Sequence, residues 1–158
     1  MRKIYAAMVF GLLAYTPLMA TAAPSTGGID QDLMSNGVIG SDYKYKDIEA
    51  ANRFFAGVYE SVNASLPAAT SDITEATSLS ISPYYSEYTH RYTFDIPAEK
   101  LPALTAGLSS PRMLKKLCQE SYLTEKFLSA NNHTMIFTYI QKNGDKIADI
   151  TMSRSTCK

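Results

Sequence analysis

The sequence TMIFTYIQKNGDKIADITM, residues 134–152, carries the strongest local structural signal in the chain. Asn143-Gly144 separates two alternating runs, and this dipeptide tolerates the positive backbone angles of a two-residue hairpin turn. If Lys142 faces Asp145, the six apolar residues of the two runs share one face, pairing Met135 with Met152, Phe137 with Ile150 and Tyr139 with Ala148. A slip of one residue would destroy that segregation, so the sequence predicts this register for a C-terminal β-hairpin.

A second pair of strands is predicted upstream, over residues 76–96. Apolar residues alternate with serines on either side of Leu79, Pro83 interrupts the pattern, and a new alternation runs from Tyr88 to Ile96. Such alternation is typical of half-buried antiparallel strands. Together with the C-terminal hairpin, it indicates an α+β domain in which a small antiparallel sheet of about four strands packs against helices.

Helical periodicity fills the rest of the chain. Apolar residues recur at steps of three and four over residues 46–64, which predicts an amphipathic helix that ends before Pro67. After Pro97 the pattern predicts three shorter helices, one on a leucine stripe, one starting at Ser110-Pro111 and ending at a cysteine, and one over about 121–130. These helices separate the two pairs of strands.

The N-terminus resembles a secretory signal peptide. Arg2 and Lys3 precede an apolar stretch that is too short to span a bilayer, and small residues follow it, so we expect cleavage after Ala22. No cysteine lies near that point, which excludes an acylated N-terminus on the usual motif. The mature chain is therefore expected to have no integral membrane segment. It would carry a net charge of about −2, because processing removes two basic residues and no acid.

Residues 23–45 are rich in serine, glycine, threonine and aspartate and show no sustained apolar period. They are predicted to form a flexible leader. The domain organisation expected from the sequence is thus a signal peptide at 1–22, a leader at 23–45 and a single domain at 46–158.

Cys118 and Cys157 are the only cysteines in the sequence. In an exported chain such a pair is expected to form one disulfide, because oxidising compartments favour pairing. The alternative is a redox-active or nucleophilic thiol. No Cys-x-x-Cys pair supports that alternative, and neither cysteine has a histidine near it in sequence.

Residues that could carry catalysis are sparse. His90 and His133 do not stand at a metal-ligand spacing with other histidines, cysteines or acids, so no metal is predicted. The sequence has no Gly-x-Ser-x-Gly elbow and no phosphate-binding glycine motif, so no cofactor is predicted either. Glu87 and Asp95 could be imagined as a hydrolytic carboxylate pair, but their even offset is typical of a solvated strand face. We therefore expect a protein that is not an enzyme.

Four tyrosines, at positions 84, 85, 88 and 92, form the clearest candidate contact surface. Tyrosine is enriched at protein interfaces, and Tyr84, Tyr85, Tyr88 and Tyr92 are accordingly predicted to bind a protein partner. Tyrosine is also an ordinary strand former. Nucleic acid is not an expected partner, because the chain has 15 basic and 15 acidic residues and no basic patch accompanies the tyrosines.

The C-terminal half resembles the β-type pilotins of type II secretion systems. The resemblance rests on the helix from Met113 to Cys118, the hairpin at Asn143-Gly144 and the closing segment from Arg154 to Cys157. It implies a noncatalytic periplasmic protein that binds a protein partner, such as a secretin subunit, during assembly of a bacterial envelope machine. This chain departs from that family because pilotins are lipoproteins and no acylated cysteine follows its signal peptide.

Two other functions are compatible with the sequence. One is a secreted effector or toxin-like protein that acts outside the cell, with the leader as a flexible export segment. The other is a small hydrolase or ligand-binding domain that uses His90. The family resemblance favours the protein-binding function over both.

Overall fold

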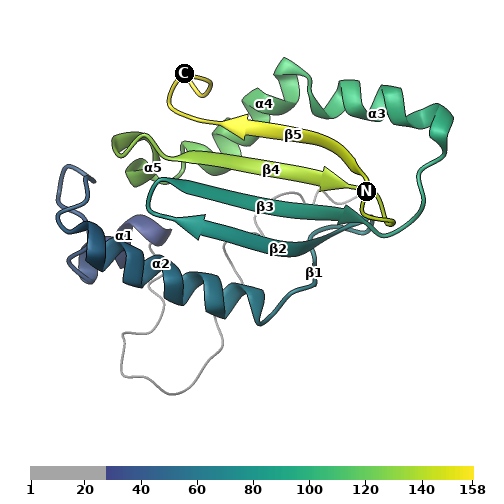
Figure 1. Ribbon diagram of the computed structural model, residues 1–158. Helices are drawn as coiled ribbons and strands as arrows, with labels where there is room; N and C mark the ends of the chain where they lie inside the picture. Colours follow the sequence, from purple (N-terminus) through teal and green to yellow (C-terminus); the bar gives the residue numbers. More distant parts are fainter. Residues whose placement is uncertain (1–27) are drawn as a thin grey trace.

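The computed structural model describes residues 28–158, and the predicted signal peptide lies outside them. The elements are five α-helices and one five-stranded sheet with strand order β1-β2-β3-β4-β5 (Figure 1). The helices are α1 (Gly28–Ser35), α2 (Ile48–Asn63), α3 (Leu101–Leu108), α4 (Pro111–Leu117) and α5 (Lys126–Ala130). The strands are β1 (Ala68–Ala69), β2 (Thr74–Ser82), β3 (Tyr85–Tyr92), β4 (Thr134–Ile140) and β5 (Lys146–Met152).

The sheet is mixed, which corrects the expectation of a purely antiparallel sheet with about four strands. The β2–β3 and β4–β5 pairs are antiparallel as predicted, but β3 and β4 run parallel, from Tyr85 opposite Thr134 to Arg91 opposite Ile140. A parallel pair cannot be joined by a tight turn and needs a long crossover. Residues 93–133 provide that crossover and contain α3, α4 and α5. The α+β class itself is confirmed.

The C-terminal hairpin has the predicted register over most of its length. Met135, Phe137 and Tyr139 face their predicted partners Met152, Ile150 and Ala148. The tip differs: the amide of Gln141 donates to the carbonyl of Asp145 (2.8 Å), so the loop has three residues instead of two. Of the two turn residues, only Gly144 has a positive φ (+95°). A register shift beside Ile140 then restores the predicted alignment.

The upstream hairpin is confirmed, but its second strand ends earlier than predicted. β3 ends at Tyr92, and Phe94 and Ile96 lie beyond it, with Phe94 45% exposed. The alternation of apolar residues therefore continues past the end of the strand. A further irregularity occurs between Ala76 and Ser78 in β2, where one residue is inserted into the ladder.

Capping residues explain where two of the helices begin. The Asp47 carboxylate accepts the amide of Glu49 (2.8 Å) at the start of α2, and the Ser110 hydroxyl accepts the amide of Met113 (3.2 Å) at the start of α4. The third predicted crossover helix is shorter than expected. A π-helical turn occupies Cys118–Tyr122, and α5 begins only at Lys126.

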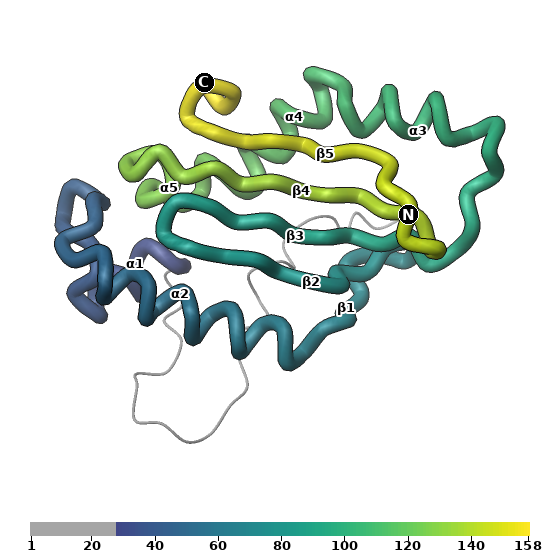
Figure 2. Tube along the Cα trace, in the orientation of Figure 1, coloured from purple at the N-terminus to yellow at the C-terminus, as the bar shows by residue number. Residues whose placement is uncertain are grey.

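The helices leave one face of the sheet uncovered. In Figures 1 and 2, α3 and α4 lie behind β5, α5 lies behind the start of β4, and α2 runs beside β2. No helix of residues 28–158 crosses in front of the strands in these views. The buried apolar side chains of β4 and β5 point to the helix-covered face, because Met135, Phe137, Ile150 and Met152 all belong to the core.

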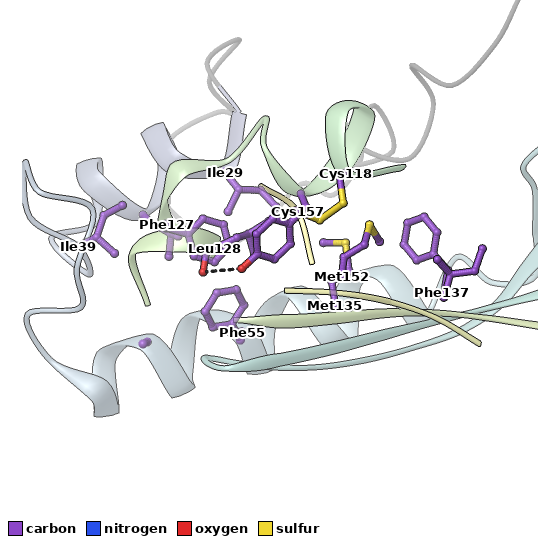
Figure 3. Packing of buried hydrophobic residues seen from close by; sticks show 14 of the residues in the cluster. Ile29, Ile39, Phe55, Cys118, Phe127, Leu128, Met135, Phe137, Met152 and Cys157 are labelled. Atoms are coloured by element: carbon purple, nitrogen blue, oxygen red, sulfur yellow. Dashed lines mark hydrogen bonds between the residues drawn. A yellow bond between two sulfur atoms is a disulfide. The ribbon is translucent and has the colours of Figure 1, made fainter. Parts of the chain in front are cut away.

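The disulfide between Cys118 and Cys157 joins the crossover to the segment after β5. The two Cα atoms are 5.3 Å apart, both residues are buried, and the pairing predicted from the sequence is confirmed. Figure 3 shows the bond among the core side chains, near Met135 and Met152. Beside it, the buried Tyr122 hydroxyl donates to the His133 carbonyl (2.9 Å), which ties the π-helical turn to the start of β4.

Residues 28–45 belong to the folded domain, whereas the sequence predicts a flexible leader up to residue 45. They contribute Ile29, Leu33, Val38 and Ile39 to the core. Too few apolar residues lie in this segment to give a clear period, and the helix α1 has only eight residues. Its stability must therefore come from tertiary contacts.

This segment is also joined to α5 by reciprocal hydrogen bonds of Asp30 and Glu125, which we call the clasp. The Asp30 carboxylate accepts the amides of Lys126 (2.8 Å) and Phe127 (3.0 Å) at the start of α5. In return, the Glu125 carboxylate accepts the amide of Asp30 (2.8 Å) near the start of α1. Each carboxylate thus satisfies unpaired amides at the beginning of the other helix. Burial raises the pKa of Glu125.

We expect the disulfide to be a large part of the stability of the domain. The bond spans 39 residues, and closing a loop of this length contributes about 4 kcal/mol in the chain-entropy model. The double variant Cys118→Ala/Cys157→Ala should lower the free energy of unfolding by about that amount, measured by urea denaturation. A reducing agent should destabilise the wild type similarly and leave the variant unchanged. Equal stability of variant and wild type would contradict this expectation.

The clasp is also expected to stabilise the domain. Asp30→Ala leaves two amides at the start of α5 without their acceptor and should lower the free energy of unfolding by about 1–2 kcal/mol. Asp72→Ala is a matched control, because Asp72 is exposed in the loop before β2. That control should change stability by less than about 0.5 kcal/mol in the same urea titration. The clasp has no such role if both variants unfold at the same urea concentration.

Candidate partner-binding site

The four tyrosines predicted as contact residues do not form one surface. Tyr84 lies in the turn between β2 and β3 and is 52% exposed. Tyr85 is on the uncovered face of β3, and Tyr88 and Tyr92 are on the helix-covered face, because side chains alternate along a strand. Tyr92 is only 7% exposed, so the expectation of a surface aromatic is wrong for it. Tyr88 packs edge to face against Phe137, with ring centroids 5.4 Å apart.

Tyr84 is the exposed end of a row of aromatic rings that leads into the core. Its ring packs edge to face on Tyr45 (5.6 Å between centroids), and Tyr45 packs in the same way on Phe55 (6.4 Å). The Tyr45 hydroxyl donates to the carbonyl of Pro83, and burial raises the pKa of Tyr45. Tyr84 is therefore held on one side by a fixed ring while the rest of its surface is open to a partner.

The uncovered side of the sheet, which we call the open face, carries a polar network. The Thr138 hydroxyl lies 2.9 Å from carboxylate oxygens of both Glu87 on β3 and Asp149 on β5. The Tyr85 hydroxyl donates to Glu87, and Lys146 Nζ is 2.8 Å from Asp149. The open face includes Tyr85, Glu87, Thr89 and Arg91 on β3, Ile136, Thr138 and Ile140 on β4, Asp149 and Thr151 on β5, and Glu75 and Ser80 on β2.

This network has more acidic than basic side chains, because it contains the carboxylates of Glu87 and Asp149 and only one cation, Lys146. The hydrogen bond from Lys146 is the main cause that lowers the pKa of Asp149, and the hydrogen bond to Glu87 raises the pKa of Tyr85 to about 12. Thr138 has a single hydroxyl proton, so it can donate to only one of the two carboxylates at a time. The centre of the open face thus presents carboxylate oxygens that a cationic side chain of a partner could satisfy.

Sequence reasoning missed the partner of Glu87. Asp95, the suggested partner, lies beyond the end of β3, and the carboxylate that shares the Thr138 hydroxyl with Glu87 belongs to Asp149, 62 positions away. No periodicity signals this pairing, because it depends on the parallel alignment of β3 with β4. Among residues 28–158, no group of three or more potential metal ligands comes together.

The two histidines are buried in different environments. Both ring nitrogens of His133 have partners, the Pro83 carbonyl and the Ser86 hydroxyl, each at 3.0 Å. His90 is 6% exposed, stacks on Tyr139 (5.3 Å between centroids), and its buried Nε2 has no hydrogen-bond partner in the described part of the chain. Desolvation lowers the pKa of His90 to about 4. Its ring is thus largely enclosed, whereas the ligand site suggested for it from the sequence would need an accessible ring.

The remaining exposed apolar side chains are scattered over several elements. Apart from Tyr84, they are Ile48 and Tyr59 on α2, Ile73 before β2, Phe94 after β3 and Leu123 after the π-helical turn. Within residues 28–158, no helix is both long enough and apolar enough to cross a bilayer.

Comparison with known proteins identifies similar structures. No family model and no curated protein matches the chain. A crystal structure of a predicted secreted protein from Pseudomonas aeruginosa matches with a TM-score of 0.51 at 9% identity, covering 70% of this chain and 96% of that one.

Two type II secretion pilotins are also similar in structure. They are EpsS from Vibrio vulnificus (TM-score 0.46, 16% identity) and AspS from Vibrio cholerae (TM-score 0.44, 12% identity). Each match covers 70% of this chain and 94% of the pilotin. Of the three structures, the Pseudomonas protein shows the shared fold.

The buried state of His90 predicts a loss of stability in acid. The unfolded state takes up a proton near pH 6.5 whereas the folded state resists it until about pH 4, so the contribution is complete above pH 6.5 and is lost as the pH falls to 4. The free energy of unfolding should fall by roughly 3 kcal/mol over that range from this group. His90→Phe should reduce this dependence, measured by urea denaturation at pH 7 and pH 4.5. An unchanged pH dependence in the variant would show that another group causes it.

Proposed function

We propose that this protein is an exported, noncatalytic protein-binding domain that serves as an accessory or assembly factor of a bacterial envelope secretion or pilus system. The observation that carries the proposal is the segment from α4 to Cys157, whose helix, hairpin and closing cysteine resemble β-type pilotins in sequence. In the fold these parts form one disulfide-linked unit. A rigid unit of this kind suits docking, because little conformational entropy is lost when a preorganised surface binds.

The sheet has one edge that a partner strand could reach. On the β2 side, β1 covers part of the edge, and the side-chain amide of Asn63 donates to the Leu79 carbonyl (2.8 Å) and accepts its amide (3.0 Å). That edge is therefore occupied by the chain itself. On the other side β5 is the last strand of the sheet. An unpaired edge strand can add an extended peptide through main-chain hydrogen bonds.

The open face would provide specificity next to that edge. Asp149 and Thr151 of β5 lie on the open face, in line with Glu87 of β3 and Tyr85 at its start. A segment that pairs with β5 could place a basic side chain against the carboxylates of Asp149 and Glu87. Tyr84 and Tyr85, at the same end of the sheet, are the aromatic contacts that we retain from the four predicted by the sequence.

The proposed location is the periplasm, and the proposed partner is a subunit of the envelope machine, such as a secretin. Both follow from the predicted signal peptide and from the sequence resemblance. Because no acylation site follows the signal peptide, the binding function proposed here does not depend on lipid. Fractionation would distinguish this location from release into the medium, which the effector hypothesis requires.

Site-specific photo-crosslinking would test the proposal. The full chain, produced in its own bacterium, would carry a photo-reactive amino acid at Thr151 on β5, at Tyr84, or at the control position Glu60, which is exposed on α2 away from the sheet face. We expect the first two positions to yield a crosslinked envelope secretion or pilus subunit, identified by mass spectrometry, and the control to yield none. Crosslinks at all three positions alike, or at none, would contradict the proposal.

A further inference from the structure

A surface hollow of about 370 Å³ lies where the chain returns after β5. It is lined by Asn132, at the entry to β4, and by Ser153, Arg154, Ser155 and Lys158 of the C-terminal segment. The lining of the hollow shares no residue with the Asp149–Glu87 network and does not include Tyr84. Its lining contains two cationic side chains, two hydroxyls and one amide, all of which can donate hydrogen bonds.

The segment that forms this hollow is held in place by covalent and hydrogen bonds. The Cys157 amide donates to the Ser153 carbonyl (2.9 Å), and the Ser153 amide donates to the Thr156 hydroxyl (2.8 Å). Cys157 is in turn bonded to Cys118. Arg154 and Ser155 therefore project from a closed turn, so their backbone is already ordered before any ligand binds.

The two cationic side chains of the hollow form no salt bridge with a neighbouring side-chain acid among the residues that the structure describes. Neither Arg154 nor Lys158 belongs to a salt bridge within residues 28–158, where the three salt bridges involve Arg91, Lys116 and Lys146 instead. The expected mature chain carries a net charge of about −2, so this is a basic site on a mildly acidic molecule. A guanidinium fork beside an ammonium group and hydroxyl donors is the donor set that proteins use to bind phosphate.

We propose that the hollow between Asn132 and the 153–158 segment is a binding site for a phosphate group. Arg154 donates two hydrogen bonds to phosphate oxygens and Lys158 neutralises the remaining charge. The Ser155 hydroxyl, which lies 2.9 Å from the Ser153 hydroxyl, accepts from Ser153 and donates to the phosphate. These two cationic side chains attract a phosphate monoester, whose charge at neutral pH lies between −1.5 and −2. The hollow is open to solvent, so the group esterified to the phosphate, whether a soluble metabolite or a lipid, remains outside.

Titration of the mature protein would test this site. Inorganic phosphate, added at constant ionic strength, should shift the NMR resonances of the backbone amides of Arg154, Ser155 and Asn132. The shifts should saturate, and they should give a dissociation constant on the order of 1 mM. The double variant Arg154→Gln/Lys158→Gln should weaken this binding at least tenfold. A matched control, Arg112→Gln/Lys115→Gln, removes two exposed cations of α4 and should bind phosphate like the wild type.

Vesicles distinguish the two sources of the phosphate group. If the site holds a lipid headgroup, the wild type and the α4 control should sediment with phosphatidylglycerol vesicles but not with phosphatidylcholine vesicles, and the Arg154→Gln/Lys158→Gln variant should remain in solution. Phosphate binding without vesicle binding would assign the site to a soluble phosphorylated ligand. The proposal is overturned if 10 mM phosphate shifts none of the three resonances, or if both double variants weaken binding equally.

Discussion

The parallel pairing of β3 with β4 is the constraint on which the rest of the structure depends. Each hairpin forms from residues that are close in sequence, but the two hairpins meet edge to edge with parallel strands. The chain must therefore cross the sheet between Tyr92 and Thr134, and it does so on one side only. That crossover places α3, α4 and α5 over the buried apolar side chains of β4 and β5 and leaves the opposite face uncovered.

Two long-range links then fasten the other segments to the crossover. The Cys118–Cys157 bond joins its π-helical turn to the segment after β5, and the Asp30–Glu125 clasp joins α1 to the start of α5. Each link closes a long loop of the chain, of 39 residues for the disulfide and 95 for the clasp. Without these links, the hydrophobic core alone would have to offset the entropy lost when the loops close. The result is a scaffold with a fixed helical side and an open sheet side. We place the proposed partner on the open side.

The same arrangement explains why the candidate site only partly follows the predicted one. The tyrosine cluster is one feature in sequence, but the alternation of β3 and the turn before it divide its members among an exposed turn, the open face and the core. The Glu87–Thr138–Asp149 network was not foreseeable, because its three members come from three different strands. The basic hollow likewise joins Asn132 to residues that are more than 20 positions away.

The sequence by itself determined the local elements: the α2 helix and its Asp47 cap, the start of α4 at Ser110, and the pairing of Phe137 with Ile150 in the C-terminal hairpin. It also determined which cysteines pair, because only two exist. These features depend on residue spacing and on short-range hydrogen bonds. Tertiary structure decided the parallel β3–β4 pairing, the packing of residues 28–45 onto the core and the Asp30–Glu125 clasp. The physical reason is that each of these joins backbone or carboxylate groups from segments that are distant in sequence, where no local preference selects the partner.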